Sequence, residues 1–228
     1  MYIGGEKIYT TIEDEIKEDE KILALFDPFI KKVGTQFDTV IGYSEGEWPG
    51  DKAISRSEQT SLGRLIGLAF SQRMATDLTI HNSGGIRDGI DEGPITLKDI
   101  RKVAPWGNNI CSISLTGADL KKYLRYAVSR STGDGGYPQI TVINPKFFFP
   151  IVDTKIYKLA LNDFLASGGD GYPKLDDKDG FVNSGYPDYD VISDYIKANS
   201  SIKRPIRALD YRFHTDYKRI KAAVEVKL

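Results

Sequence analysis

The stretch from which the chain is best interpreted reads Leu161-Asn162-Asp163-Phe164-Leu165-Ala166-Ser167-Gly168-Gly169-Asp170-Gly171-Tyr172-Pro173. A mostly apolar run before it, Tyr157 to Leu161, predicts a strand that leads Phe164 into a loop of three glycines around Asp170. An aromatic face and a carboxylate on one loop suit a planar base and a ribose diol. The simpler alternative is a tight turn beside a core Phe, and the stretch taken alone fits that alternative better.

Composition narrows the class of protein. The chain has 228 residues, of which 40% are apolar, so we expect a sizeable core in one large or two small domains. Its 31 basic and 32 acidic residues argue against a nucleic-acid polymer or an anionic membrane as the main partner. Cys111 has no second cysteine to pair with and is predicted to be structural. No signal peptide or membrane-spanning run is recognisable.

Hydrophobic periodicity predicts an alternation of helices and strands. Helices are expected at residues 12–33 (with Pro28 kinking or breaking the helix), 61–74, 98–103, 120–129 and 189–198. Strands are expected at residues 39–43, 78–80, 110–115, 139–143, 146–151 and 157–161, with a polar loop at 174–185 and two further strands in the tail, 207–228. The order indicates an α+β fold, with a mixed β-sheet and flanking helices.

Several kinds of catalytic site lack support. There is no P-loop, no dinucleotide-binding glycine motif and no G-x-S-x-G elbow. The two histidines, His81 and His214, are far apart in the sequence and have no clustered acidic companions, so a pair of catalytic metals is not expected in this chain. Asp163 and Asp170 are a conceivable acid/base pair, but nothing in the sequence fixes their separation.

Two other segments carry groups suited to ligands. Asn82-Ser83-Gly84-Gly85-Ile86-Arg87 follows a predicted strand, so its glycines can form a backbone nest and Arg87 can bind a phosphate or carboxylate. The alternative is a surface ion pair of Arg87 with Asp88 or Asp91. Trp106, between Pro105 and Gly107, is either a core residue or a second ring for stacking on a base.

With these segments in order, the chain resembles the C-terminal domain of the 5'-nucleotidase family, especially the bacterial periplasmic UDP-sugar hydrolase/5'-nucleotidases. The likeness covers residues 22–200 and is carried by Gln59-Thr60-Ser61-Leu62-Gly63-Arg64-Leu65, Asn82-Ser83-Gly84-Gly85-Ile86-Arg87, Gly93-Pro94-Ile95-Thr96, Pro105-Trp106-Gly107-Asn108, Leu115-Thr116-Gly117 and the opening stretch from Asn162 to Pro173.

The resemblance implies a substrate-binding domain. Trp106 and Phe164 fall on the positions of two rings that clamp the base, and Asp170 falls on the carboxylate that takes the ribose hydroxyls. The other implied substrate-binding residues are Lys52, Arg56 and Arg87 for ribose or phosphate, Asn108 and Gly135 near the base, and Asn82. Three positions depart from the family's pattern: Trp106 replaces Phe, Lys52 replaces Arg, and Gln59 replaces Glu.

The resemblance also implies a division of labour. Residues 1–35 would be an interdomain linker helix and residues 36–228 the binding domain, whereas a metallophosphoesterase domain preceding Met1 would hold two divalent metal ions and hydrolyse the phosphate ester. This chain alone would then lack catalytic residues and cofactors and be inactive. The parent would be a periplasmic, cell-surface or secreted enzyme acting on nucleoside 5'-monophosphates or UDP-sugars. Alternatives are a parent acting mainly on 2',3'-cyclic nucleotides, and a stand-alone nucleoside-binding module.

Overall fold

The computed structural model describes residues 19–212 and 216–225, and the chain divides into two compact units, Met1–Phe37 and Asp38–Leu228. The first unit contains α1 (Glu20–Phe37), which begins after Asp19, whose carboxylate accepts the Lys21 amide hydrogen at 2.9 Å. The helix continues through Pro28, so it is one helix and not two. The predicted start of this helix, at residues 12–18, lies outside the described residues.

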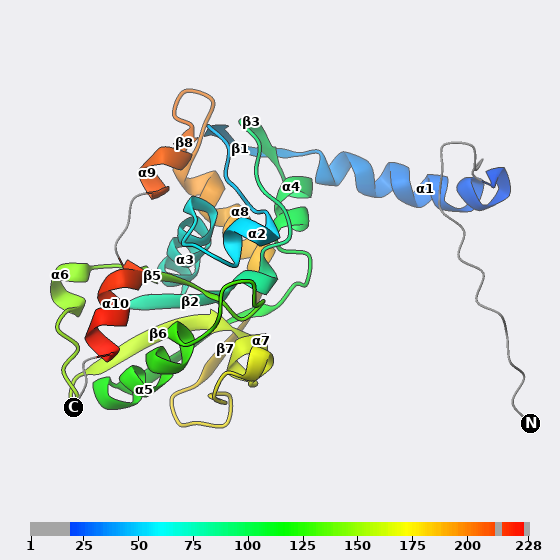
Figure 1. The fold of residues 1–228 in the computed structure, drawn as a ribbon. Coiled ribbons are helices and arrows are strands. Elements are labelled where there is room, and N and C mark those ends of the chain that lie inside the picture. Colours follow the sequence, from blue (N-terminus) through cyan, green and yellow to red (C-terminus); the bar gives the residue numbers. More distant parts are fainter. Residues whose placement is uncertain (1–18, 213–215, 226–228) are drawn as a thin grey trace, which may run out of the picture. The chain divides into compact units, whose positions relative to one another are not determined.

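The second unit is built around a mixed five-stranded sheet, which confirms the predicted fold class (Figure 1). Its strands, in spatial order, are β5 (Pro138–Val142), β2 (Leu78–Asn82), β6 (Ile156–Asn162), β4 (Asn109–Thr116) and β7 (Val182–Pro187). β2 and β6 run parallel, and every other neighbouring pair is antiparallel. A smaller sheet contains β3 (Gly93–Thr96), β1 (Val40–Glu45) and β8 (Ile206–Arg207).

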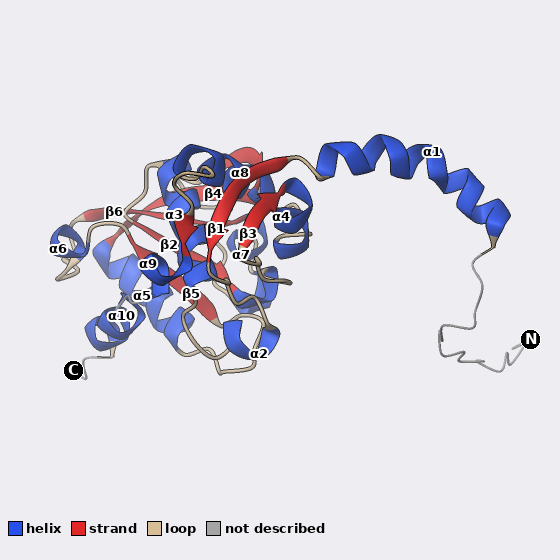
Figure 2. Cartoon of the chain, turned by 90° about the horizontal axis from the view of Figure 1, so that it is seen from above, coloured by secondary structure: helices blue, strands red, loops and turns tan. Residues whose placement is uncertain are grey.

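Helices cover both faces of the five-stranded sheet and create two apolar cores (Figures 1 and 2). α5 (Gly117–Val128) and α10 (Asp216–Val224) bury Leu120, Leu124 and Ile220 in one core. α3 (Ser61–Met74), α4 (Leu97–Val103) and α8 (Asp188–Asn199) supply the other. Thr60 caps α3 by accepting the Gly63 amide hydrogen at 2.9 Å. No described helix is both long and apolar enough to span a bilayer.

Three of the predicted elements were wrong. Residues 146–151 are not a strand, because α6 (Pro145–Phe148) begins at Pro145, whose fixed φ suits the first position of a helix. The predicted polar loop at 174–185 includes the start of β7, an edge strand whose exposed polar residues look like loop sequence. In the described part of the tail, Arg207 ends β8, and the residues after it form α9 (Ala208–Arg212) and α10, which buries Ile220 and Val224 one helical turn apart. His214 lies outside the described residues.

Candidate functional site

Four strand ends meet at one edge of the five-stranded sheet. Because β2 and β6 are parallel neighbours, their carboxyl ends at Asn82 and Asn162 lie at the same edge. β4 and β5 are antiparallel to them, so the loops that precede Asn109 and Pro138 lie there as well. The topology thus gathers loops that are far apart in the sequence. The short helix α7 (Asp163–Ala166) adds Phe164, and Arg56 directly follows the short helix α2 (Lys52–Ser55).

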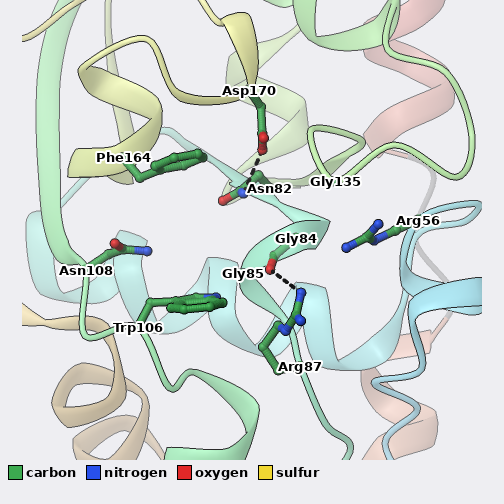
Figure 3. Close-up of a pocket in the computed structure, with 10 residues that line it drawn as sticks. All are labelled: Arg56, Asn82, Gly84, Gly85, Arg87, Trp106, Asn108, Gly135, Phe164 and Asp170. Atoms are coloured by element: carbon green, nitrogen blue, oxygen red, sulfur yellow. Dashed lines mark hydrogen bonds between the residues drawn. The ribbon is translucent and has the colours of Figure 1, made fainter. Parts of the chain in front are cut away.

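These loops surround a pocket of about 460 Å³, a size suited to a small organic ligand. The pocket is lined by Arg56, Asn82, Gly84, Gly85, Arg87, Trp106, Asn108, Gly135, Phe164 and Asp170 (Figure 3). The structure therefore brings together every substrate-binding candidate from the sequence except Lys52. Lys52 lines an adjoining hollow, which shares Arg87 with the pocket and also contains Asp51 and Asp88.

Two aromatic rings face each other across the pocket (Figure 3). The exposed fractions are 62% for Trp106 and 41% for Phe164, so neither ring is the core residue that the simpler interpretation of each segment requires. Trp106 stands on the loop before β4, and Phe164 stands on α7 directly after β6. Exposed aromatic rings are costly to hydrate and are suited to stacking on a planar ligand.

Backbone angles and close contacts explain the glycines in the loop after α7. Gly168 has a φ of +96°, and a Cβ on Gly169 would lie about 2.5 Å from the Phe164 ring. Asp170 itself adopts the left-handed conformation, with φ of +52°, and its Oδ2 accepts a hydrogen bond from Asn82 Nδ2 at 2.9 Å. The loop consequently presents a carboxylate to the pocket, beside the backbone of Gly135 (Figure 3).

Two guanidinium groups border the same pocket without carboxylate partners in the described part of the chain. Arg56 Nη1 donates to the Gly133 carbonyl at 3.4 Å, while its buried Nε has no partner among the described residues. Arg87 Nη1 lies 3.5 Å from the Gly84 carbonyl, and its Cζ lies 5.5 Å from the centroid of the Trp106 ring. Neither forms the ion pair that the alternative interpretation of Arg87 predicts, so both can bind an anionic ligand.

The structure adds residues that the prediction of the site did not include. Gly84 and Gly85 line the pocket, and the glycine nest noted in the sequence was the signal for them. Asn162 has no exposed surface and donates a hydrogen bond to the pocket residue Asn82, and nothing in the sequence separates it from an ordinary helix cap. Within residues 19–212 and 216–225, no group of three or more His, Cys, Asp or Glu side chains is arranged to hold a metal ion.

The backbone of a residue with a buried carboxyl group, Asp188, supports one wall of the pocket. The Asp188 amide donates to the Asn108 carbonyl at 2.8 Å, and the Asp188 side chain is almost fully buried. Burial raises the pKa of Asp188 to about 7, and the negative charge of Asp163 adds to this, while Arg101 and the Tyr189 amide oppose it. Asp188 therefore carries a proton in the folded state over a pH range in which an unfolded Asp is ionised.

This raised pKa predicts a pH dependence of stability. Between about pH 4 and pH 7 the folded state holds a proton on Asp188 that the unfolded state has lost, so its contribution to stability falls as pH rises through this window. His81, whose pKa burial lowers to about 4, contributes in the opposite direction. We therefore expect the free energy of unfolding of wild type minus that of Asp188→Asn, measured with urea, to be larger at pH 5 than at pH 7.5. An equal difference at both pH values would contradict this prediction.

A family profile and two curated proteins are similar in sequence to this chain. A family profile described as "5'-nucleotidase, C-terminal domain" matches residues 40–147. The chain is 37% identical over 211 residues to the "5'-nucleotidase" of Vibrio cholerae serotype O1, covering 88% of this chain and 38% of that protein. It is 36% identical over 219 residues to "Protein UshA" of Yersinia enterocolitica, covering 91% of this chain and 39% of that protein. The chain thus spans about two fifths of the length of these curated relatives.

A solved structure shares the fold. The crystal structure of the 5'-nucleotidase precursor from Thermus thermophilus superposes with a TM-score of 0.70 at 25% sequence identity. The match covers 82% of this chain and 42% of that one. The share of the chain in this match is larger than the segment matched by the family profile, residues 40–147.

Proposed function

The chain belongs to the 5'-nucleotidase C-terminal domain family, and we propose that its pocket binds the nucleoside part of a nucleotide substrate. The observation that carries this proposal is the presence of three complementary kinds of group in one pocket of about 460 Å³. Trp106 and Phe164 suit the two faces of a base, and Asp170 suits the ribose hydroxyls. Arg56 and Arg87 suit the phosphate, because neither is neutralised by a carboxylate of the described residues.

In this proposal the chain binds and orients its substrate, and a separate domain performs the hydrolysis. Residues 36–228 form the binding domain and residues 1–35 the linker to a preceding metallophosphoesterase domain, which holds two divalent metal ions. The described residues offer no cluster of ligands that fits such a metal pair. The contribution of the chain is to hold a nucleoside 5'-monophosphate or UDP-sugar with its phosphate positioned for attack, which lowers the entropic part of the barrier.

The parent protein, in the same proposal, is an exported phosphoric ester hydrolase, and the chain alone binds without turnover. Isothermal titration of the purified chain with adenosine, AMP, UMP and UDP-glucose tests binding, and a phosphate-release assay with added Mn²⁺ or Zn²⁺ tests turnover. We expect saturable binding of AMP and no release of phosphate. Absence of binding to all four compounds would reject a nucleoside site, and metal-dependent release by the pure chain would reject the division of labour.

The role of Arg87 gives a second test. Arg87→Met keeps much of the side-chain volume and removes the charge, so AMP binding should weaken by about tenfold, the value of one charge-assisted hydrogen bond. Adenosine binding should change by less than about twofold, because adenosine has no phosphate. Calorimetric titration at 50 mM and 500 mM NaCl should also show that the preference of wild type for AMP over adenosine shrinks with salt.

Arg73→Met is the matched control for this test, because Arg73 stacks on Tyr186, with its Cζ 3.8 Å from the ring centroid, and lies outside the pocket. Its affinity for AMP should equal that of wild type. If Arg87→Met weakened AMP and adenosine binding by the same factor, Arg87 would be supporting the pocket wall and not binding phosphate.

A further inference from the structure

One buried residue connects the ring and the carboxylate of the pocket without lining the pocket itself. Asn162 ends β6, has no exposed surface and is absent from the pocket lining. We propose that Asn162 is a positioning residue, whose amide oxygen holds the helical turn bearing Phe164 and whose amide nitrogen orients Asp170 through Asn82. The inference rests on the proposed function, because it assumes that this pocket binds a nucleoside.

The oxygen of the Asn162 amide fixes the position of Phe164. Oδ1 accepts the Leu165 amide hydrogen at 2.9 Å and so caps α7, the four-residue helix Asp163–Ala166. A helix this short is not stable by its own hydrogen bonds, so its cap matters for where Phe164 points. The contact of the Phe164 ring with Gly169 then places the glycine-rich loop against the same helical turn.

The nitrogen of the same amide begins a chain of hydrogen bonds that ends at the carboxylate. Asn162 Nδ2 donates to Asn82 Oδ1 at 3.0 Å, and Asn82 Nδ2 donates to Asp170 Oδ2 at 2.9 Å (Figure 3 shows the second bond). Because Asn82 Oδ1 is engaged as an acceptor, the NH₂ group of Asn82 must face Asp170. The hydrogen bond from Asn162 thereby fixes the orientation of the Asn82 amide, with its NH₂ group toward the Asp170 carboxylate. Asp170 Oδ1 stays available for a ligand hydroxyl.

His81 helps to keep the Asn162 amide in this orientation. His81 Nδ1 lies 3.5 Å from Asn162 Nδ2, and the imidazole is buried. Burial lowers the pKa of His81 to about 4, so the ring is neutral at ordinary pH and its Nδ1 can accept the second amide hydrogen. Reversing the Asn162 amide would turn its oxygen toward two acceptors, His81 Nδ1 and Asn82 Oδ1, and its NH₂ group toward the Leu165 amide.

The chain of hydrogen bonds from Asn162 through Asn82 to Asp170 predicts that Asn162 affects recognition of the ribose diol specifically. Asn162→Asp and Asn162→Ser both keep an acceptor that can cap α7, but neither supplies the NH₂ donor that orients Asn82. We expect each variant to bind adenosine about tenfold more weakly than wild type, because one ligand hydroxyl loses its oriented acceptor. Binding of 2',3'-dideoxyadenosine, which lacks both hydroxyls, should change by less than about twofold. Calorimetric titration of both ligands measures this selectivity.

A double-variant comparison tests whether the effect passes through Asp170. In an Asp170→Ala background, Asn162→Ser should cause no additional loss of adenosine affinity. A measurement on wild type tests the inference even if the variants do not fold. In the NMR spectrum of wild type, adenosine should shift the side-chain amide resonances of Asn162 and Asn82, whereas 2',3'-dideoxyadenosine should shift them much less.

Several outcomes would overturn the inference. Equal losses of affinity for the two ligands would mean that Asn162 supports the structure generally. Unchanged affinity for both ligands would mean that Asn162 has no role in the site. Equal amide shifts with both ligands would mean that the hydrogen bonds from Asn162 to Asp170 do not respond to the diol. Failure of wild type to bind any of adenosine, AMP, UMP and UDP-glucose would reject the proposed function as well. Binding by wild type with a preference for adenosine over dideoxyadenosine supports the proposed function independently, so the two failures are distinguishable.

Discussion

Replacement of Asp170 by alanine is expected to weaken adenosine binding by about 100-fold or more. A carboxylate that accepts two ribose hydroxyls forms two charge-assisted hydrogen bonds, each contributing about 1.5 to 3 kcal/mol. The substitution also leaves the Nδ2 of the almost fully buried Asn82 without the acceptor that it now has at 2.9 Å. Isothermal titration with adenosine measures the loss, and circular dichroism melting establishes that the variant is folded.

Two controls separate recognition of the diol from damage to the loop. Asp170→Asn keeps a side chain that tolerates the left-handed φ of +52°, so it changes the charge with little change in the backbone. Asp176→Ala removes an exposed carboxylate from a nearby part of the chain that does not line the pocket. Asp176→Ala should bind adenosine as wild type does, and Asp170→Asn should be substantially weaker. Full adenosine affinity in folded Asp170→Ala would exclude this carboxylate from ribose recognition.

Removal of both aromatic rings, in a Trp106→Ala/Phe164→Ala variant, should weaken nucleoside binding by about 100-fold. Stacking contributes about 1 to 3 kcal/mol per aromatic contact with a base, and the two rings face each other across the pocket (Figure 3). Because the rings are 62% and 41% exposed, little core packing is lost, and we expect the melting temperature to change only slightly. Adenosine and uridine should both lose affinity, since stacking does not require a particular base.

Tyr186→Ala is the matched control for the ring variant. Tyr186 is 48% exposed and stands on β7, outside the pocket lining, so its removal alters exposed aromatic surface without altering the proposed site. The single variants Trp106→Ala and Phe164→Ala show whether the rings act on the same base. A double variant no weaker than either single variant would mean that only one ring stacks.

Much of the fold followed from local patterns in the sequence. α3 was predicted at residues 61–74 and is found at Ser61–Met74, because its apolar spacing and the cap at Thr60 favour the same helix. β7 and α10 were missed for different reasons. β7 is a strand only because it pairs with β4, and α10 lies against the core with Asp216 held by Arg64 at 2.9 Å. Pairing with β4 leaves no signal within β7 itself, whereas α10 does carry helical spacing, in Ile220 and Val224, which the prediction of strands overlooked.

The sequence by itself determined the family, the α+β class and most of the residues that line the pocket, because these follow from short motifs and their order. Only the tertiary structure decided how those residues meet. The parallel pairing of β2 with β6 brings Asn82 and Asn162 to one edge, and Lys52 is carried into the adjoining hollow. The direction of each buried amide is set by neighbours some 80 residues away. Hydrogen-bond geometry in a buried network depends on every partner at once, which no single segment of sequence contains.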